Sequence, residues 1–308
     1  MDKRQKKRQE YRKLPLGYYH LCTDGWGKGK LFHNRKQFAL GMTAIALVSL
    51  RYNVKIYVFA LMPNHIHILL SATGNDCVEV FDFLLRRINK QLKEDGYPPL
   101  PEDYDFQLLP IKDQESFRDH FIYIARNYYE KGFVVPGGCL WCSDYLLFSQ
   151  WADLIRGERV DDMSQRKVRG IIKSEMSLPA HWEIHPEWGI LPRNFVSMEK
   201  VREMFPSVKT YLTRLIKGYE SFVHISDTLG EHFCFSEEEI KEIVEQLREK
   251  YYPHRSLKDL SADEKSRLAV LLNEMYYIDA ATIARLLHIS QHIVSQVLRS
   301  KDFASRRR

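Results

Sequence analysis

Two histidines stand one residue apart in an apolar stretch of the sequence, "ALMPNHIHILLSA", residues 60–72. If this stretch is a β-strand, residues i and i+2 point to the same face, so His65 and His67 project together. Each neutral imidazole carries a donor and an acceptor, and both need partners in an apolar core. Because imidazole is also a common metal ligand, the pair could form half of a divalent-metal site. The alternative is a pair of half-exposed strand histidines that bind nothing.

A tyrosine with polar neighbours marks a second stretch, "FRDHFIYIARNYYEKG". Asp119, Tyr123 and Asn127 are spaced by four residues and therefore share one face of a helix. A tyrosine hydroxyl, with a pKa of about 10, is a weak nucleophile unless it is activated. A metal ion that polarises a phosphodiester would make its attack feasible and would give a phosphotyrosine product. Tyr128 and Tyr129 are alternative nucleophiles, but they lie about 140° and 240° around the helix from Tyr123.

Strand and helix signals alternate around both stretches. Period-two and β-branched runs predict strands at residues 17–25, 54–63, 65–72 and within 97–111. Helical spacing of apolar residues predicts helices at 34–50, 77–96 and 113–131. This order predicts an α+β fold over residues 15–150, with a ferredoxin-like (split βαβ) antiparallel sheet that carries helices.

The second half of the chain is predicted to be mainly helical. We expect a helical extension over residues 151–255, in which residues 179–194, "PAHWEIHPEWGILPRN", form an ordered loop. Residues 256–308 end in a helix-turn-helix pattern, with the small Ala284 at the helix crossing and His288 in the bend. In that pattern Gln291, His292 and Arg299 belong to the outer, DNA-binding face of the second helix. A plain helical hairpin is the alternative.

The charge distribution favours a polyanionic partner. Lys and Arg number 46 against 40 acidic residues, for a formal net charge of +6. Residues 1–14 form a basic arm, and nucleic acid is the usual partner of such a segment; a solvated tail is the alternative. Arg86, Arg87 and Lys90, on the helix expected at 77–96, are candidates for phosphate contacts or equally for a solvated face.

The cysteines and the apolar runs indicate the compartment. The five cysteines are an odd number, no apolar leader follows the N-terminal charges, and no run approaches the length of a membrane span. We therefore expect a reducing, cytoplasmic location; the family resemblance given below implies a bacterial, nucleoid-associated one. Cys139 and Cys142 form a single C-x-x-C, which we interpret as two packed thiols, because a zinc site needs further ligands.

Four stretches resemble a known family. "YYHLCTDG", "LMPNHIHILL", "YIARN" and "GFVVPGGCLWCSDY" occur in the order and spacing of the HUH endonucleases, specifically of the single-tyrosine transposases in the REP-associated tyrosine transposase group. The resemblance covers residues 15–150. The Arg-Gly that this family carries in its first strand is Asp24-Gly25 here, which removes a DNA contact.

The resemblance implies a site and a reaction. His65 and His67 would bind a divalent metal, Mg²⁺ or Mn²⁺, with Asn127 as a third, polar ligand. Tyr123 would attack single-stranded DNA to give a 5′-phosphotyrosine and a free 3′-OH. The chain would then be a metal-dependent single-strand DNA endonuclease and transposase that cleaves and rejoins DNA at hairpin-containing sites.

The same resemblance implies the partners. A single-stranded DNA hairpin is the expected substrate, and the C-terminal tail is expected to bind duplex DNA near the cleavage site. No membrane partner is expected, and a homodimer is left open. We expect removal of residues 257–308 to weaken site binding and to spare metal-dependent nicking.

Three other function classes compete with this interpretation. A catalytically silent DNA-binding regulator derived from a transposase would keep the fold and need not cut. An RNA-binding sheet would need an aromatic and glycine run that this sequence lacks. An H-x-H-x-H nucleotide hydrolase would need a histidine at position 69, which is Leu69. Replacing Tyr123 separates these classes, since only the tyrosine enzyme depends on its hydroxyl.

Overall fold

The computed structural model describes residues 3–25, 28–130, 138–149, 151–217, 219–229, 237–276 and 278–305. The chain divides into two compact units, Met1–Leu215 and Ile216–Arg308. The sheet layer and the segment 151–215 therefore share one unit. Most of the "GFVVPGG" stretch and the side chains of Tyr129 and Arg299 lie outside the described residues.

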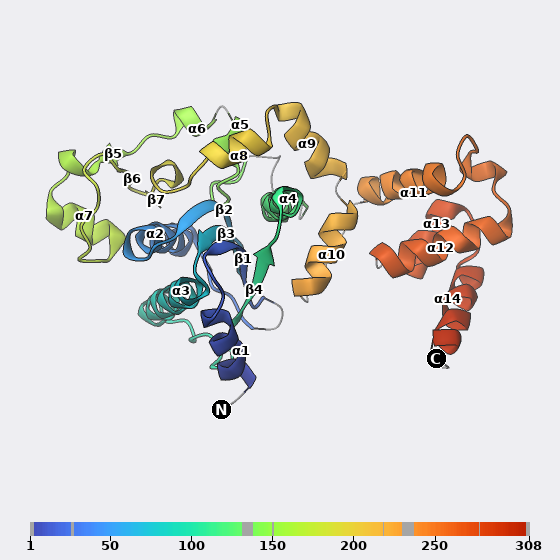
Figure 1. Ribbon diagram of the computed structural model, residues 1–308, viewed down its shortest axis with the longest axis horizontal. Helices are drawn as coiled ribbons and strands as arrows, with labels where there is room; N and C mark the ends of the chain where they lie inside the picture. The colour runs from blue at the N-terminus through green and yellow to red at the C-terminus, as the bar shows by residue number, and fades with distance from the viewer. Residues whose placement is uncertain are drawn as a thin grey trace. The chain divides into compact units, whose positions relative to one another are not determined.

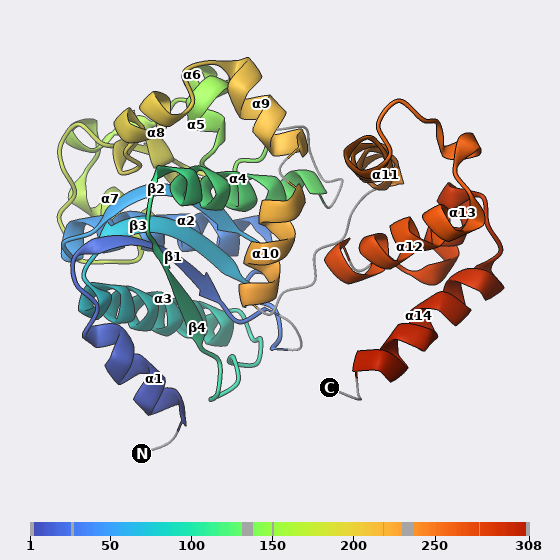
Figure 2. The same ribbon diagram turned by 45° about the vertical axis from the view of Figure 1, so that its right-hand side comes forward.

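The first half of the first unit is an α+β layer built on an antiparallel sheet (Figure 1). Its elements are α1 (Lys3–Arg12), β1 (Gly17–Thr23), α2 (Arg35–Arg51), β2 (Lys55–Leu61), β3 (Ile66–Ala72), α3 (Gly74–Glu94), β4 (Phe106–Ile111) and α4 (Gln114–Glu130). The strand order is β2-β3-β1-β4, and every neighbouring pair is antiparallel. Helices α2 and α3 lie on one face of the sheet, and α4 lies on the other (Figure 2). The predicted α+β class and antiparallel sheet are confirmed.

Local signals explain where these helices begin and end. The side chain of Asn34 accepts a hydrogen bond from the Gln37 amide at the start of α2, and Thr73 does the same for Asp76 in α3. Such side-chain caps satisfy amide groups that have no partner in the first turn. After α3 the chain turns at Gly96, whose φ of 77° is a conformation that glycine adopts readily.

The outer edge of β2 is covered by a later segment of the chain. The amide of Leu61 donates to the Trp141 carbonyl at 2.9 Å, and the amide of Ser143 donates to the Phe59 carbonyl at 3.0 Å. The Ser143 hydroxyl in turn accepts from the Phe59 amide at 3.0 Å. The backbone groups on this side of β2 are thus paired within the molecule.

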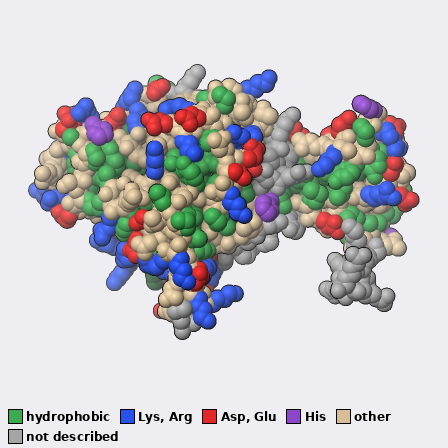
Figure 3. Space-filling view, viewed as in Figure 1, with side chains coloured by type: hydrophobic (Ala, Val, Ile, Leu, Met, Phe, Trp, Pro, Cys, Tyr) green, Lys and Arg blue, Asp and Glu red, His purple; other side chains and the backbone are tan. Residues whose placement is uncertain are grey.

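The expected basic arm is a helix, α1, that covers the other outer strand, β4. The ammonium group of Lys7 donates to the Phe106 carbonyl at 2.7 Å, and the Leu108 amide donates to the Tyr11 hydroxyl at 3.3 Å. Arg8 forms ion pairs with Asp82 and Asp105. In Figure 3, basic and acidic side chains are mixed over this helix. Several of its charges therefore already have acidic partners, which local sequence could not reveal.

A glycine at the start of α3 allows α1 to lie close. A Cβ atom at Gly74 would lie 1.9 Å from the backbone oxygen of Tyr11 and 2.8 Å from Cβ of Leu14. Backbone cannot move aside cheaply, so we expect Gly74→Ala to lower the free energy of unfolding by about 1–3 kcal/mol. Urea unfolding followed by circular dichroism measures this change.

The matched control for that substitution is Gly170→Ala. Gly170 lies inside a helix, and its added Cβ would meet no atom within 4 Å. Alanine there should be neutral or stabilising by about 0.5–1 kcal/mol, because glycine costs more backbone entropy in a helix. Equal effects of the two substitutions would contradict the close packing of α1 at Gly74.

The rest of the first unit contains short elements around a small second sheet. They are α5 (Tyr145–Phe148), α6 (Trp151–Leu154), β5 (Glu158–Arg159), α7 (Gln165–Ile172), β6 (Glu183–His185), β7 (Gly189–Ile190), α8 (Glu199–Met204) and all but the last two residues of α9 (Val208–Lys217). The stretch 179–194, expected to be a loop, contains β6 and β7. They pair through a turn that ends at Gly189, whose φ is 75°. Strands of two or three residues leave no periodic signal, so the sequence could not reveal them.

The second unit is helical. Its elements are α10 (Tyr219–Leu229), α11 (Glu237–Tyr251), α12 (Ala262–Tyr276), α13 (Ala280–Leu287) and α14 (Gln291–Ser305). His288, between α13 and α14, has a φ of 52°, so the bend holds the left-handed conformation that favours glycine. Ala284 and Val294 are buried on either side of the bend. Among the described helices of the chain, none combines the length and the apolar character of a membrane span.

Candidate active site

The two histidines of the H-x-H stretch lie together under α4. Their ring centroids are 4.7 Å apart, and the rings are perpendicular. His67 lies in β3, directly opposite Cys22 of β1 and Ala60 of β2, so it belongs to the middle of the sheet. His65 is 6% exposed and His67 is fully buried. This burial does not fit the alternative of two half-exposed strand histidines.

Tyr123 of α4 packs against the same face of the sheet. Its ring centroid lies 5.7 Å from that of His67 and 6.0 Å from that of His20. The tyrosine is 3% exposed. The structure thus brings the predicted nucleophile and the predicted metal-binding pair together from elements more than fifty residues apart in the sequence.

Two further histidines complete the cluster, and the sequence reasoning missed both. His20 of β1 is 3.0 Å from His67, measured from its Nε2 to Nδ1, and 2.9 Å from His120 of α4, measured between the Nδ1 atoms. Burial and the neighbouring histidines hold the pKa of His20 well below its usual value, which favours the neutral ring. Two local signals could have indicated them. On a strand, His20 shares a face with Cys22, and on a helix, His120 is a neighbour of Tyr123 because the two are three residues apart.

His65 is held from a different side. Its Nδ1 lies 2.9 Å from Oδ1 of Asn64, and Nδ2 of Asn64 donates to the Gly25 carbonyl at 3.2 Å. A Cβ atom on Gly25 would lie only 3.2 Å from Cβ and Nδ1 of His65. The backbone at position 25 can approach the imidazole this closely because glycine has no side chain.

Asn127, the predicted third ligand, lies one turn after Tyr123 on α4. Its Nδ2 donates to the Tyr123 carbonyl at 3.0 Å, so any bond to a metal would have to use Oδ1. Within the described part of the chain, no group of three or more His, Cys, Asp or Glu side chains is arranged to hold a metal ion. That His65, His67 and the Asn127 amide bind a divalent ion stays a prediction.

Tyr128, an alternative nucleophile, has a structural contact. Its hydroxyl donates to the backbone carbonyl of Leu61 in β2. Burial raises the pKa of Tyr128, which makes its phenolate harder to form. Among the tyrosines of α4 with described side chains, Tyr123 is the one beside the histidines.

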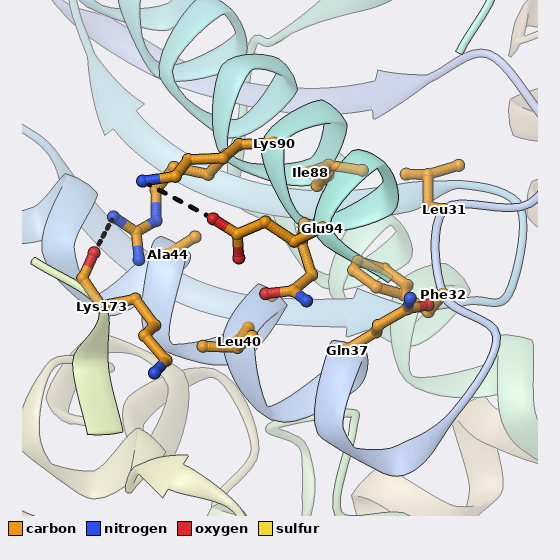
Figure 4. A pocket seen from close by; sticks show the side chains of 12 residues that line it. Leu31, Phe32, Gln37, Leu40, Ala44, Ile88, Lys90, Glu94 and Lys173 are labelled. Carbon is orange, nitrogen blue, oxygen red and sulfur yellow. Dashed lines mark hydrogen bonds and ion pairs between the residues drawn. The ribbon is translucent and has the colours of Figure 1, made fainter. Parts of the chain in front are cut away.

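The basic residues predicted to bind DNA on α3 lie across the sheet from Tyr123. The guanidinium of Arg87 donates to the carbonyls of Ile172 at 2.7 Å and Lys173 at 3.3 Å, where it covers the C-terminal end of α7. Figure 4 shows Lys90 reaching toward Glu94 above a cavity of about 50 Å³ between α2 and α3. Arg86 is exposed. The structure does not bring these side chains together with the histidine cluster.

The thiols of the C-x-x-C stretch are packed in the segment that covers β2. Cys139 and Cys142 are 7% and 0% exposed, and both are free. Burial raises the pKa of Cys139 to about 12, and burial also raises the pKa of Cys142 well above its usual value. A raised pKa lowers the thiolate population at any pH below it.

We therefore expect both thiols to resist alkylation. At about pH 8, a pKa raised by about three units lowers the thiolate fraction of Cys139 by about 10³-fold. Iodoacetamide labelling followed by peptide mass spectrometry should show little modification of Cys139 and Cys142 in the native protein and complete modification in urea. Fast native labelling would contradict the packed arrangement.

The predicted duplex-binding residues lie on α14 in the second unit. Gln291 and His292 are exposed in its first turn. The neighbouring Ile293 is 41% exposed, whereas Val294 is fully buried against the unit. The first turn of α14 thus presents polar side chains to solvent from a helix that is anchored on its other face.

Comparisons with known proteins give a partial likeness of fold. No protein-family model and no curated protein matches the chain. Among solved structures, the chain is similar to the protein in one described as "Structure of the REP associates tyrosine transposase bound to a REP hairpin". The sequence identity is 15% and the TM-score is 0.38. The likeness covers 45% of this chain and 82% of that chain. A likeness at this level assigns no activity to the chain.

Proposed function

We propose that the chain is a single-tyrosine HUH transposase of the REP-associated type. It would cleave and rejoin single-stranded DNA at hairpin-containing sites through a 5′-phosphotyrosine. The observation that carries this proposal is the buried cluster in which the His67 ring lies 4.7 Å from the ring of His65 and 5.7 Å from the ring of Tyr123. The motif resemblance of residues 15–150 supports the same assignment independently of this geometry.

The chemistry would begin at the Tyr123 hydroxyl. Its oxygen forms a bond to phosphorus, the bond from phosphorus to the 3′ oxygen breaks, and the proton lost by the phenol balances the proton gained by the 3′-OH. A divalent metal, Mg²⁺ or Mn²⁺, supplies polarisation of the phosphodiester when bound. His65 and His67 would hold the metal, with Oδ1 of Asn127 as the third protein ligand.

Burial constrains how DNA reaches the tyrosine. Tyr123 is 3% exposed, and the backbone at Gly25 lies against His65. Because so little of this residue is open to solvent, we expect a phosphate to reach the hydroxyl only after neighbouring groups move. The proposal therefore includes a rearrangement of the groups around Tyr123 when DNA binds.

The connections of the sheet support the catalytic fold. Helix α2 joins β1 to β2 with β3 between them, and α3 joins β3 to β4 with β1 between them. These are the connections of the ferredoxin-like, split βαβ layer, and we assign that layer to the HUH domain. In such a layer the sheet presents one face to two helices and keeps the other for a site.

A covalent-trapping gel tests the reaction. The full chain is mixed with labelled single-stranded hairpins from the flanks of its own gene, with Mn²⁺ or with a chelator. We expect a slower, denaturant-resistant band that requires the metal. If the protein binds the hairpins on a native gel but forms no such band, the silent regulator is the better assignment.

Duplex binding is a second proposed function, assigned to α13 and α14. The left-handed bend at His288, the buried Ala284 at the crossing and the exposed first turn of α14 support a DNA-binding helix-turn-helix. Because α12 to α14 share a unit with α10 and α11, point substitutions test this better than truncation. Gln291→Ala with His292→Ala should weaken duplex binding by about 10-fold or more and leave covalent transfer to single strands unchanged. A parallel loss of both would contradict separate roles.

A further inference from the structure

Three buried histidines form a continuous hydrogen-bonded chain between two strands and a helix. His20 lies in the middle, 3.0 Å from His67 and 2.9 Å from His120. His20 and His67 are fully buried, and His120 is 8% exposed. In a neutral imidazole one ring nitrogen donates and the other accepts. The tautomers of the three rings are therefore not independent, because each hydrogen bond needs one donor and one acceptor.

The three linked imidazoles can place the protons of their hydrogen bonds in two arrangements. In the first, Nδ1 of His67 donates to Nε2 of His20, and Nδ1 of His20 donates to His120. His67 then carries a lone pair on Nε2. In the second arrangement the bonds run the other way, His20 donates to Nδ1 of His67, and the His67 proton sits on Nε2. A protonated nitrogen cannot bind a metal, so only the first arrangement makes His67 a ligand through Nε2.

The tautomer of His65 follows from its contact with Asn64. Its Nδ1 lies 2.9 Å from Oδ1 of Asn64. Because Nδ2 of Asn64 donates to the Gly25 carbonyl, the amide is oriented with its oxygen toward the imidazole. An amide oxygen only accepts. Nδ1 of His65 therefore carries the proton, and its Nε2 carries the lone pair.

We propose that His20 and Asn64 are positioning residues that hold His67 and His65 as their Nδ1–H tautomers, so that both Nε2 atoms present lone pairs to one divalent cation. In this arrangement Nδ1 of His120 accepts the hydrogen bond from Nδ1 of His20. The inference rests on the proposed function for the identity of the ligand. It also links the predicted ligands, His65 just before β3 and His67 within it, to the helix of Tyr123, because His120 lies three residues before the tyrosine on α4.

The wild-type protein provides the first test. In full-length protein labelled with ¹⁵N-histidine and kept free of metal, long-range ¹H–¹⁵N correlation spectra report which ring nitrogen is protonated. Spectra of single His65→Gln and His67→Gln variants assign the signals. We expect an Nδ1–H pattern for both rings at neutral pH. An Nε2–H pattern for either ring, alone or averaged with the other form, overturns the proposal.

The second test compares matched variants for Mn²⁺ affinity, measured by electron paramagnetic resonance. His20→Leu removes the acceptor facing His67, whereas His20→Gln places an amide oxygen near the position of Nε2. Loss of such an outer partner typically weakens metal binding by about 10–100-fold. We expect that loss for leucine and an affinity within about threefold of wild type for glutamine. Equal affinities of the two variants overturn the role of His20.

Two matched substitutions at Asn64 test the proposal at a position that is not fully buried. Its side chain is only partly buried, so substitutions there should fold. Asn64→Leu should weaken Mn²⁺ binding by about 10-fold or more, and Asn64→Asp, which keeps an acceptor oxygen, should not. Equal weakening by both variants counts against the proposal. A wild-type protein that binds no Mn²⁺ counts against the proposed function, whereas the tautomer assignment is decided by the nitrogen signals.

Discussion

The Tyr123→Phe variant should form no covalent adduct with single-stranded hairpin DNA, a loss of at least about 10³-fold. The substitution removes one oxygen and keeps the ring that packs against His20 and His67. The fold and the histidine cluster should therefore persist, while the nucleophile is absent. The measurement is the denaturant-resistant band with Mn²⁺, compared with binding of the same hairpin on a native gel.

Tyr128→Phe is the matched control for this variant. It removes a hydroxyl that donates to the Leu61 carbonyl, on the same helix. We expect a loss of about 1 kcal/mol in the free energy of unfolding, typical of one hydrogen bond, and an unchanged covalent band. Loss of the band in Tyr128→Phe with its retention in Tyr123→Phe would move the nucleophile to Tyr128. Retention in both variants would exclude these two hydroxyls as the attacking groups.

Replacing His65 and His67 together by alanine has the second largest expected effect. Both predicted imidazole ligands are lost, so Mn²⁺ affinity should fall by at least about 10²-fold, and metal-dependent cleavage should fall with it. Isothermal titration with Mn²⁺ measures the affinity. Because His67 is fully buried and hydrogen-bonded to His20, circular dichroism must show that the double variant is folded at the temperature used.

The control for the pair is His185→Ala. His185 stacks on Trp188 in the small second sheet, with ring centroids 3.7 Å apart. The substitution removes one imidazole from the protein and leaves the histidine cluster beside Tyr123 unchanged. We expect unchanged Mn²⁺ affinity. If His185→Ala and the double variant bind Mn²⁺ alike, the metal does not bind at His65 and His67.

The parts of the fold that follow from local chemistry were predictable. The helix capped by Asn34 was predicted at its observed start, whereas α3 begins at Gly74, three residues before the predicted start at residue 77. The alternation that turns His65 and His67 to one side is encoded within a few residues. The α+β class followed from the order of these elements. The roles of His65 and His67 as metal ligands stay a prediction, as does the role of Asn127.

What the sequence could not supply depends on distant partners. His20 and His120 are 100 residues apart, and neither has a local feature that indicates a hydrogen bond to the other. The basic arm was predicted to bind nucleic acid, with a solvated tail as the alternative, because its partner Asp105 lies 97 residues beyond Arg8 and leaves no local signal. In both cases tertiary packing decided the outcome after the local elements had formed.

The covering of both outer strands has a consequence for self-association. An open strand edge offers unpaired amides and carbonyls to any other chain and is a common route to aggregation. On β2 these groups are taken by the segment around Trp141 and Ser143, and on β4 by Lys7 and Tyr11 of α1. A second copy therefore finds no free template at these positions. If the protein dimerises, it must use a surface other than a continuous intermolecular sheet through these paired groups.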